Sequence, residues 1–164
     1  MSEKQVEVLI TVPFNEVLVN RLREVSPRLR FTFSPGRKVE DISPEVWERC
    51  EILYTDKLVP PLALVPRLRW IQYHYAGIEF VLGSPLLKKP DLQLTTLSGT
   101  SATPTAEFAF SLMLALGYHL PELMASQRRA EWQRDRWDKL GRVEIRGSTV
   151  GLVGYGSIKR ELAR

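Results

Sequence analysis

The sequence is short of cysteine and of long apolar runs, and both shortages exclude whole classes of protein. Cys50 is the only cysteine among 164 residues, so no disulfide can form within the chain, and a reducing compartment fits. No run approaches the ~20 apolar residues that a membrane-spanning helix needs. Residues 1–7 carry mixed charge and do not read as a signal peptide. We therefore expect a cytoplasmic protein without a membrane span.

Residues that bind metals or act as nucleophiles are also scarce. His74 and His119 are the only histidines, and their apolar or aromatic neighbours favour a packed or surface role over a catalytic one. Cys50 has no histidine motif near it, so we expect it to be a small buried residue. HExxH, P-loop and GxSxG motifs are absent, which leaves metal-dependent hydrolysis, P-loop chemistry and α/β-hydrolase chemistry unsupported. No metal site and no catalytic residue is expected.

The net charge of +4 excludes little. The lysines and arginines are dispersed, and neither zinc-ligand spacing nor a helix-turn-helix pattern accompanies them. This distribution favours a solvated surface over a nucleic-acid interface.

What the sequence does contain is an alternation of apolar strands and short helical segments over its first hundred residues. Helices are predicted after Asn15, an N-cap residue type, and after Ser43, where Pro44 suits the first helical position. This alternation is typical of a parallel sheet covered on both faces. The predicted strands are residues 6–12, 29–33, 52–54, 69–74 and 92–96.

A long helix is predicted next, with Thr103 as its N-cap and Pro104 at its first position. The stretch from Phe108 to Leu116 is apolar nearly all round, so we expect burial on most of its sides. Gly117 and Pro121 should break the helix, and a more charged helical piece should follow.

The last fifteen residues combine an apolar run with a glycine turn. Thr149–Val153 is predicted to be a buried strand, and Gly154 and Gly156 give the freedom for a tight turn before a helix. Backbone N–H groups at such a turn can hold a pyrophosphate. The dinucleotide fingerprint needs a third glycine where this chain has Lys159, so the pattern alone leaves cofactor binding and a plain strand–turn–helix about equally open. The acidic residue for the ribose is expected about 20 residues further on, beyond Arg164.

A small-residue pair follows the fourth predicted strand. Exposed N–H groups at Ala76 and Gly77, at the carboxyl end of a parallel strand, could receive a carboxylate. The alternative is an ordinary turn between a strand and a helix, which the residues by themselves favour.

Three blocks of the sequence together resemble the D-isomer-specific 2-hydroxyacid dehydrogenases, the family of hydroxypyruvate/glyoxylate reductases and phosphoglycerate dehydrogenase. They are Leu68–Glu79, Pro104–Leu116 and Ile145–Ile158, in the order and at the spacing of that family. The resemblance implies an α/β fold with a flavodoxin-like, parallel-sheet substrate domain at residues 1–100. Residues 101–164 would be a crossing helix and the first β-turn-α of a truncated NAD(P)-binding Rossmann domain.

The resemblance also implies roles for individual residues. The backbone of Ala76 and Gly77 would hold the substrate carboxylate. The family's catalytic arginine, glutamate and histidine lie in the later nucleotide domain and have no matching position here, so the resemblance implies a chain that is catalytically incomplete. The implied cofactor residues are Thr105 and Ala106 near the nicotinamide, and Gly154, Gly156, Ser157 and Ile158 at the pyrophosphate turn.

The expected function is therefore that of the N-terminal part of an oxidoreductase. It would move a hydride between NAD(P)H and a small 2-keto or 2-hydroxy acid, with this chain alone inactive and binding NAD or NADP weakly or not at all. A homodimer through the long-helix region is implied by the resemblance. Two alternatives stay open: a non-catalytic flavodoxin-like binding module and a decayed gene product. Lys159 and the early end of the chain favour the binding module, in which the C-terminal segment would be a docking arm. The intact glycine turn argues against it, because a docking arm has no need of that backbone shape.

Overall fold

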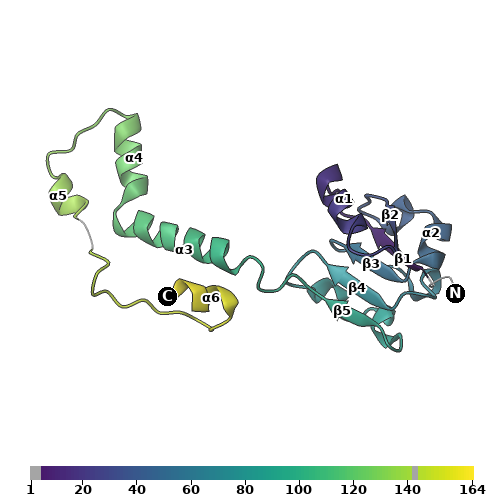
Figure 1. Cartoon of the computed structure of the whole chain (residues 1–164). Helices are drawn as coiled ribbons and strands as arrows, with labels where there is room; N and C mark the ends of the chain where they lie inside the picture. The colour runs from purple at the N-terminus through teal and green to yellow at the C-terminus, as the bar shows by residue number, and fades with distance from the viewer. Residues whose placement is uncertain (1–4, 142–143) are drawn as a thin grey trace. The chain divides into compact units, whose positions relative to one another are not determined.

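The computed structural model describes residues 5–141 and 144–164. The chain forms two compact units, of which unit 1 ends at Ser98 and unit 2 begins at Gly99. Unit 1 contains a β-sheet with short helices, and the secondary structure described in unit 2 is helical (Figure 1).

The described part of unit 1 is built on a parallel sheet of five strands in the order β2-β1-β3-β4-β5 (Figure 1). Its pairings join strands that are distant in sequence, for example Val8 with Ile52 and Ile52 with Trp70. The five strands predicted from β-branched and apolar runs are confirmed, with small differences at their ends. They are β1 (Val6–Ile10), β2 (Leu29–Phe33), β3 (Ile52–Thr55), β4 (Trp70–Tyr73) and β5 (Gln93–Thr95).

Short helices connect these strands where the sequence predicts them. Asn15 caps α1 (Glu16–Arg23), because its Oδ1 accepts a hydrogen bond from the backbone N–H of Leu18 at 3.0 Å. Helix α2 (Pro44–Arg49) starts at its predicted proline, which occupies a position where no N–H is needed. The 3-10 turn η1 (Val39–Asp41) precedes α2 in the same connection. The remaining connections contain η2 (Leu62–Leu64), η3 (Glu79–Val81) and η4 (Pro85–Lys88).

Alternation along the strands divides the apolar side chains between the two faces of the sheet. Leu9 lies in a larger cluster with Trp47 of α2, whereas its neighbours Val8 and Ile10 lie in a cluster on the face of α1. The indole Nε1 of Trp47 donates to the carbonyl oxygen of Val39 at 3.1 Å, so this buried ring leaves no polar atom unsatisfied. Both faces carry apolar clusters, as the prediction of a parallel sheet requires.

Unit 2 contains α3 (Ala102–Gly117), α4 (Leu120–Arg128), α5 (Arg136–Lys139) and α6 (Ser157–Leu162). The predicted N-cap is wrong by two residues, because α3 begins after Ser101 and includes Thr103 in its first turn. The predicted break near Gly117 is confirmed, and α3 and α4 are bent by 65° relative to each other. His119, with a left-handed φ of 50°, precedes α4 and sets the new direction.

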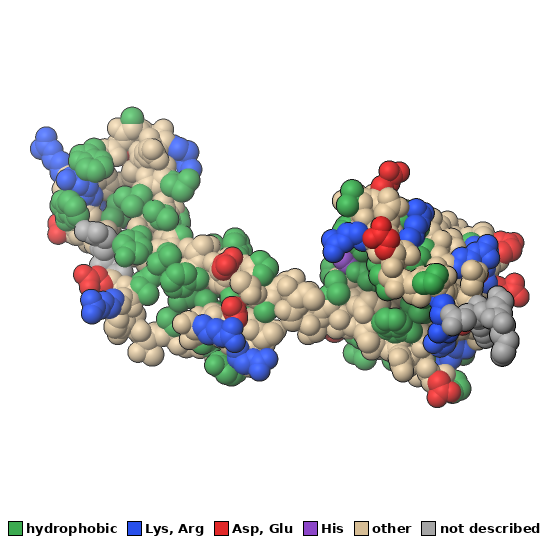
Figure 2. Space-filling view, in the orientation of Figure 1, with side chains coloured by type: hydrophobic (Ala, Val, Ile, Leu, Met, Phe, Trp, Pro, Cys, Tyr) green, Lys and Arg blue, Asp and Glu red, His purple; other side chains and the backbone are tan. Residues whose placement is uncertain are grey.

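The predicted burial of the long helix is wrong. The side chains of Phe108 and Leu116 are 64% and 69% exposed, and Ala106 is the only buried residue of α3. An all-apolar helix is buried only when other elements cover each of its sides. Among the described residues, α6 and α4 are the elements that contact α3 most. Hydrophobic side chains consequently lie on the visible surface of unit 2 (Figure 2).

The predicted strand Thr149–Val153 is also absent. This segment is irregular, and Val150 and Val153 are 49% and 89% exposed. A β-strand forms only when a neighbouring strand accepts and donates its ladder hydrogen bonds. The described residues offer this segment no such neighbour. The helix predicted after the glycine turn does form, as α6, so of the expected β-turn-α only the turn and the helix are present.

Candidate functional site

Ala76 and Gly77 lie where the sequence places them, just beyond the carboxyl end of β4. Both are exposed, and neither backbone N–H has a hydrogen-bond partner in the described part of the chain. The carboxyl ends of parallel strands meet at one edge of a sheet, which is where such sheets bind ligands. Two neighbouring free N–H groups at this edge are suitable donors for a carboxylate.

The side chain of Glu79 lies close to Gly77. A Cβ at position 77 would lie 2.8 Å from Oε2 of Glu79, so a larger residue there would make the flexible glutamate side chain move. A ligand carboxylate at the Gly77 N–H would therefore meet the negative charge of Glu79, unless the flexible glutamate side chain turns away.

Aromatic rings line the same edge of the sheet. Phe14 follows β1, Tyr54 belongs to β3, and His74 and Tyr75 follow β4. The rings of Phe14 and Tyr54 are 5.3 Å apart, and the His74 ring lies 6.0 Å from Phe14 and 5.7 Å from Tyr54. The Tyr54 hydroxyl is hydrogen-bonded to Nδ1 of His74 at 2.7 Å. This arrangement is a packed aromatic wall with one ordered polar pair inside it.

Charged groups are also present at this edge. The Lys57 ammonium lies 5.1 Å from the centre of the Tyr75 ring, a cation–π distance. Oδ1 of Asp56 is buried and has no hydrogen-bond partner in the described structure. Burial raises the pKa of the Tyr54 phenol, and the charge of Asp56 raises it further. The phenol therefore keeps its proton at neutral pH.

Sequence reasoning identified only part of this edge. His74 has the packed environment predicted for it, but its hydrogen bond to Tyr54 was not foreseen. Tyr54, Asp56 and Lys57 were not selected, although their position at and just after a predicted parallel strand was a usable signal. Cys50 is buried as predicted, and burial raises the pKa of its thiol to about 12.

The predicted phosphate-binding residues of unit 2 form a glycine turn. Gly154 has a φ of +85°, a backbone conformation that residues other than glycine rarely adopt. Gly156 is the N-cap of α6. Ser157 and Ile158 form the first turn of α6. A Cβ on Gly156 would meet no atom within 4 Å, so space for a phosphate is open on that side.

Lys159 lies beside the glycine turn. Its ammonium donates a hydrogen bond to the carbonyl oxygen of Val153. It also lies 3.5 Å from where a Cβ of Gly154 would be. The positive charge of Lys159 therefore complements the negative charge of a pyrophosphate, but the lysine side chain occupies part of the space beside Gly154.

The two residues expected near the nicotinamide lie on the first turns of α3. Thr105 is exposed, whereas Ala106 is 4% exposed and lines a hollow between α3 and α6 together with Leu162.

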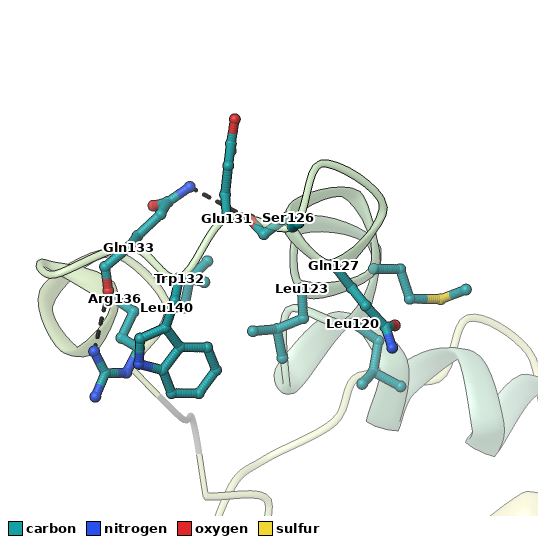
Figure 3. Close-up of a pocket in the computed structure, with 11 residues that line it drawn as sticks. Leu120, Leu123, Ser126, Gln127, Glu131, Trp132, Gln133, Arg136 and Leu140 are labelled. Carbon is teal, nitrogen blue, oxygen red and sulfur yellow. Dashed lines mark hydrogen bonds between the residues drawn. The ribbon is translucent and has the colours of Figure 1, made fainter.

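Another hollow of unit 2 is lined by residues other than those of the glycine turn. It has a volume of about 550 Å³ between α4 and α5, and Leu120, Leu123 and Trp132 give it an apolar lining (Figure 3). The guanidinium group of Arg136 stacks on Trp132 at 4.4 Å and donates to the Gln133 carbonyl oxygen at 3.1 Å. None of the predicted site residues lines this hollow.

Two further searches cover residues 5–141 and 144–164. No group of three or more His, Cys, Asp or Glu side chains could hold a metal ion there. No single helix in these ranges is long and apolar enough to cross a membrane, and the bent pair of α3 and α4 reaches that length and composition only when taken together.

Curated relatives match parts of the chain, although no family model matches it. A hydroxypyruvate reductase from Thermotoga maritima is 32% identical over 77 residues, which are 47% of this chain and 24% of that protein. A glyoxylate reductase from Thermococcus litoralis is 30% identical over 117 residues, which are 68% of this chain and 35% of that protein. The chain thus spans between a quarter and about a third of these relatives.

Solved structures match nearly the whole chain. A D-lactate dehydrogenase from Aquifex aeolicus, complexed with NAD and lactic acid, has a TM-score of 0.70 at 22% identity, covering 96% of this chain and 46% of that one. An NADPH-dependent glyoxylate/hydroxypyruvate reductase from Sinorhizobium meliloti, complexed with citrate, has a TM-score of 0.69 at 22% identity, covering 99% and 50%. At these identities the likeness establishes the fold. The sequence relatives, named as hydroxypyruvate and glyoxylate reductases, confirm the family resemblance predicted from the three blocks.

Proposed function

We propose, from its relationship to the D-isomer-specific 2-hydroxyacid dehydrogenases, that this chain is the N-terminal part of an NAD(P)-dependent oxidoreductase. The full enzyme would transfer a hydride between the nicotinamide and C2 of a small 2-keto or 2-hydroxy acid. The observation that carries the proposal is the pair of free N–H groups at Ala76 and Gly77. They lie at the carboxyl edge of a parallel sheet, where a substrate carboxylate would need them.

In this proposal the chain binds and orients but does not perform proton transfer. Ala76 and Gly77 hold the substrate carboxylate by hydrogen bonds, and the aromatic wall beside them excludes water from one side of the site. Gly154, Gly156, Ser157 and Ile158 hold the pyrophosphate of NAD or NADP, with Thr105 and Ala106 near its nicotinamide. When bound, the cofactor supplies the hydride.

We also propose that this chain alone is catalytically inactive. The resemblance places the arginine that holds the keto acid, and the histidine–glutamate pair that protonates the carbonyl, outside the matching residues. Hydride transfer to a carbonyl needs such an acid. We therefore expect no NADH oxidation by the purified chain with glyoxylate or hydroxypyruvate, and measurable turnover would refute the claim of inactivity.

Substrate binding can be tested separately from turnover. Oxalate is similar in size to a small 2-keto acid and presents the same carboxylate next to a second carbon–oxygen group, although it carries one more negative charge. We expect it to shift the backbone amide signals of Ala76 and Gly77 in NMR spectra of the ¹⁵N-labelled chain. An unchanged spectrum at tens of millimolar oxalate, roughly the limit of weak carboxylate binding, would refute the substrate site.

One specific observation favours a second function, a non-catalytic module that binds a small carboxylate. Lys159 occupies space beside Gly154, and the segment before the turn forms no strand, so the dinucleotide cradle is incomplete. Titration with NADH followed by its fluorescence tests for the oxidoreductase. Saturable binding, even if weak, that Gly154→Ala abolishes supports the oxidoreductase and contradicts the module. Because the isolated fragment is expected to bind NADH weakly or not at all, carboxylate binding without a response to NADH agrees with both functions.

Two further parts of the proposal concern partners and location. We propose a homodimer through the exposed apolar side chains of α3, α4 and the loop that follows, and a cytoplasmic location. The free, buried thiol of Cys50 supports a reducing compartment.

A further inference from the structure

The pairing of Tyr54 with His74 places an ordered imidazole at the edge of the sheet that holds Ala76 and Gly77. Strands β3 and β4 are adjacent, with Thr55 opposite Tyr73, so the residues at their carboxyl ends are neighbours. The Tyr54 hydroxyl lies 2.7 Å from Nδ1 of His74. This contact joins residues that are 20 positions apart in sequence and follows directly from the parallel register.

The direction of this hydrogen bond follows from the partners available. A phenol at neutral pH carries a proton, and burial together with Asp56 raises the pKa of Tyr54, which keeps that proton in place. In the described residues, Nδ1 of His74 is the only hydrogen-bond partner of this hydroxyl. We assign the hydroxyl as the donor and Nδ1 as the acceptor, the tautomer that gives the phenol proton a partner within the protein. A neutral imidazole that accepts at Nδ1 carries its proton on Nε2.

The ring of His74 is also held in orientation. It makes edge contacts with Phe14 at 6.0 Å, with Tyr54 at 5.7 Å and with Tyr75 at 6.3 Å. Its Nε2 has no hydrogen-bond partner within the described chain. A half-buried, oriented N–H donor that no protein group uses is available to a ligand.

We propose that the Nε2–H of His74 is an additional donor to the carboxylate of a small 2-keto acid held by Ala76 and Gly77. This inference rests on the proposed function of that edge. His74 precedes Ala76 by only two residues, so a two- or three-carbon acid at the free amides lies beside the same end of β4. Tyr54 is then a positioning residue, because it fixes which ring nitrogen carries the proton.

The test uses the whole ¹⁵N-labelled chain, with oxalate as the probe. Two-bond ¹H–¹⁵N correlation spectra of the imidazoles report the tautomer directly. We expect His74 to show the Nε2–H tautomer without ligand, and oxalate to shift its Nε2–H signal together with the amides of Ala76 and Gly77. We expect His74→Ala to raise the Kd for oxalate about tenfold, the loss typical of one hydrogen bond to a charged group.

Three further variants separate a binding role from a structural one. His74→Gln keeps an N–H donor of similar reach and should recover most of the affinity. Tyr54→Phe should populate the Nδ1–H tautomer and weaken oxalate binding about threefold, because the donor at Nε2 is then present only part of the time. His119→Gln alters the other histidine, which lies in unit 2, and should leave the Kd unchanged.

The outcomes distinguish this inference from the proposed function. If oxalate shifts the amides of Ala76 and Gly77 while His74→Ala retains the full affinity, the inference is wrong and the substrate site stands. An Nδ1–H tautomer in the free protein also overturns the inference. If the amides do not respond to oxalate at all, the proposed substrate site fails, and the inference fails with it.

Discussion

Burial of one thiol makes Cys50 a simple probe of unit 1. It is 1% exposed, and burial raises the pKa of its thiol from 9.0 to about 12. At pH 8 only about one native thiol in ten thousand is then ionised, compared with about one in ten in the unfolded chain. We expect a disulfide reagent at pH 8 to label the native chain at least ~100-fold more slowly than the chain in concentrated guanidinium chloride. Comparable rates would show that this region opens readily.

The same burial predicts a loss of stability at alkaline pH. Burial raises the pKa of Tyr73 as well, from 10.0 to about 12. Because both groups bind their protons more tightly in the folded state, their stabilisation is complete below pH 9 and falls as the pH rises toward 12. We expect the urea concentration at the unfolding midpoint of unit 1 to decrease as the pH is raised from 8 to 10.5. Cys50→Ala should show a shallower fall than the wild-type chain, and equal slopes would contradict the assignment to Cys50.

At the scale of elements, the stability of α1 depends on its cap. Oδ1 of Asn15 accepts a hydrogen bond from the Leu18 N–H at the start of the helix. We expect Asn15→Ala to lower the free energy of unfolding by about 1 kcal/mol, within the usual range of about 0.5 to 2 kcal/mol for such caps. Asn15→Asp retains an acceptor and should cost little. Urea unfolding followed by circular dichroism measures both, and an equal loss in the two variants would argue against the cap.

The irregular segment before the glycine turn should differ measurably from a paired strand. Amide hydrogens of residues 150–153 should exchange within about tenfold of unstructured rates, because they lack ladder hydrogen bonds. Amides of Val8–Ile10, in the centre of the sheet, serve as the internal reference and should exchange at least ~100-fold more slowly. Strong protection of residues 150–153 in solution would reveal a pairing partner for this segment.

The elements that were predictable are those that depend on local sequence. The strands of unit 1 follow from runs of β-branched residues, and the helix starts at Asn15 and Pro44 follow from cap chemistry that needs only neighbouring residues. The exposure of Phe108–Leu116 and the missing strand at Thr149–Val153 were not predictable in this way. Both depend on which other elements are present to cover or pair with them.

The candidate site was likewise predictable only where it depends on local sequence. The small residues at Ala76 and Gly77 have a local signature, a glycine after a predicted strand. The contact between Tyr54 and His74 has none, because it depends on the register of β3 against β4. The position of the Lys159 ammonium likewise depends on the path of the turn around Gly154.

At the scale of the whole molecule, unit 2 exposes more large apolar side chains than a monomer usually does. Met124 and Trp132 are 54% and 78% exposed, near the apolar hollow between α4 and α5 (Figure 3). Contiguous apolar surface of this kind marks interfaces or causes aggregation. Figure 2 shows such side chains gathered on the visible face of unit 2.

We therefore expect the chain to associate with itself in a concentration-dependent way. Sedimentation velocity over a hundredfold range of concentration should show a shift from monomer to dimer at micromolar chain. Trp132→Gln should weaken this association at least about tenfold, the loss expected for a large apolar anchor. Leu82→Gln is the matched control, because Leu82 is 74% exposed in unit 1. A monomer at every concentration would contradict the dimer.

The tryptophans of the two units differ in exposure. Trp47 is enclosed in the core of unit 1 at 1% exposure and Trp70 of the same unit is 36% exposed, whereas Trp132 and Trp137 of unit 2 are 78% and 68% exposed. A shielded indole emits at shorter wavelength than a hydrated one and resists collisional quenchers such as acrylamide. Unfolding of the sheet can thus be followed by the red shift of the Trp47 emission. Binding of a partner to the helical surface can be followed by the reduced acrylamide quenching of Trp132 and Trp137, without attaching any dye.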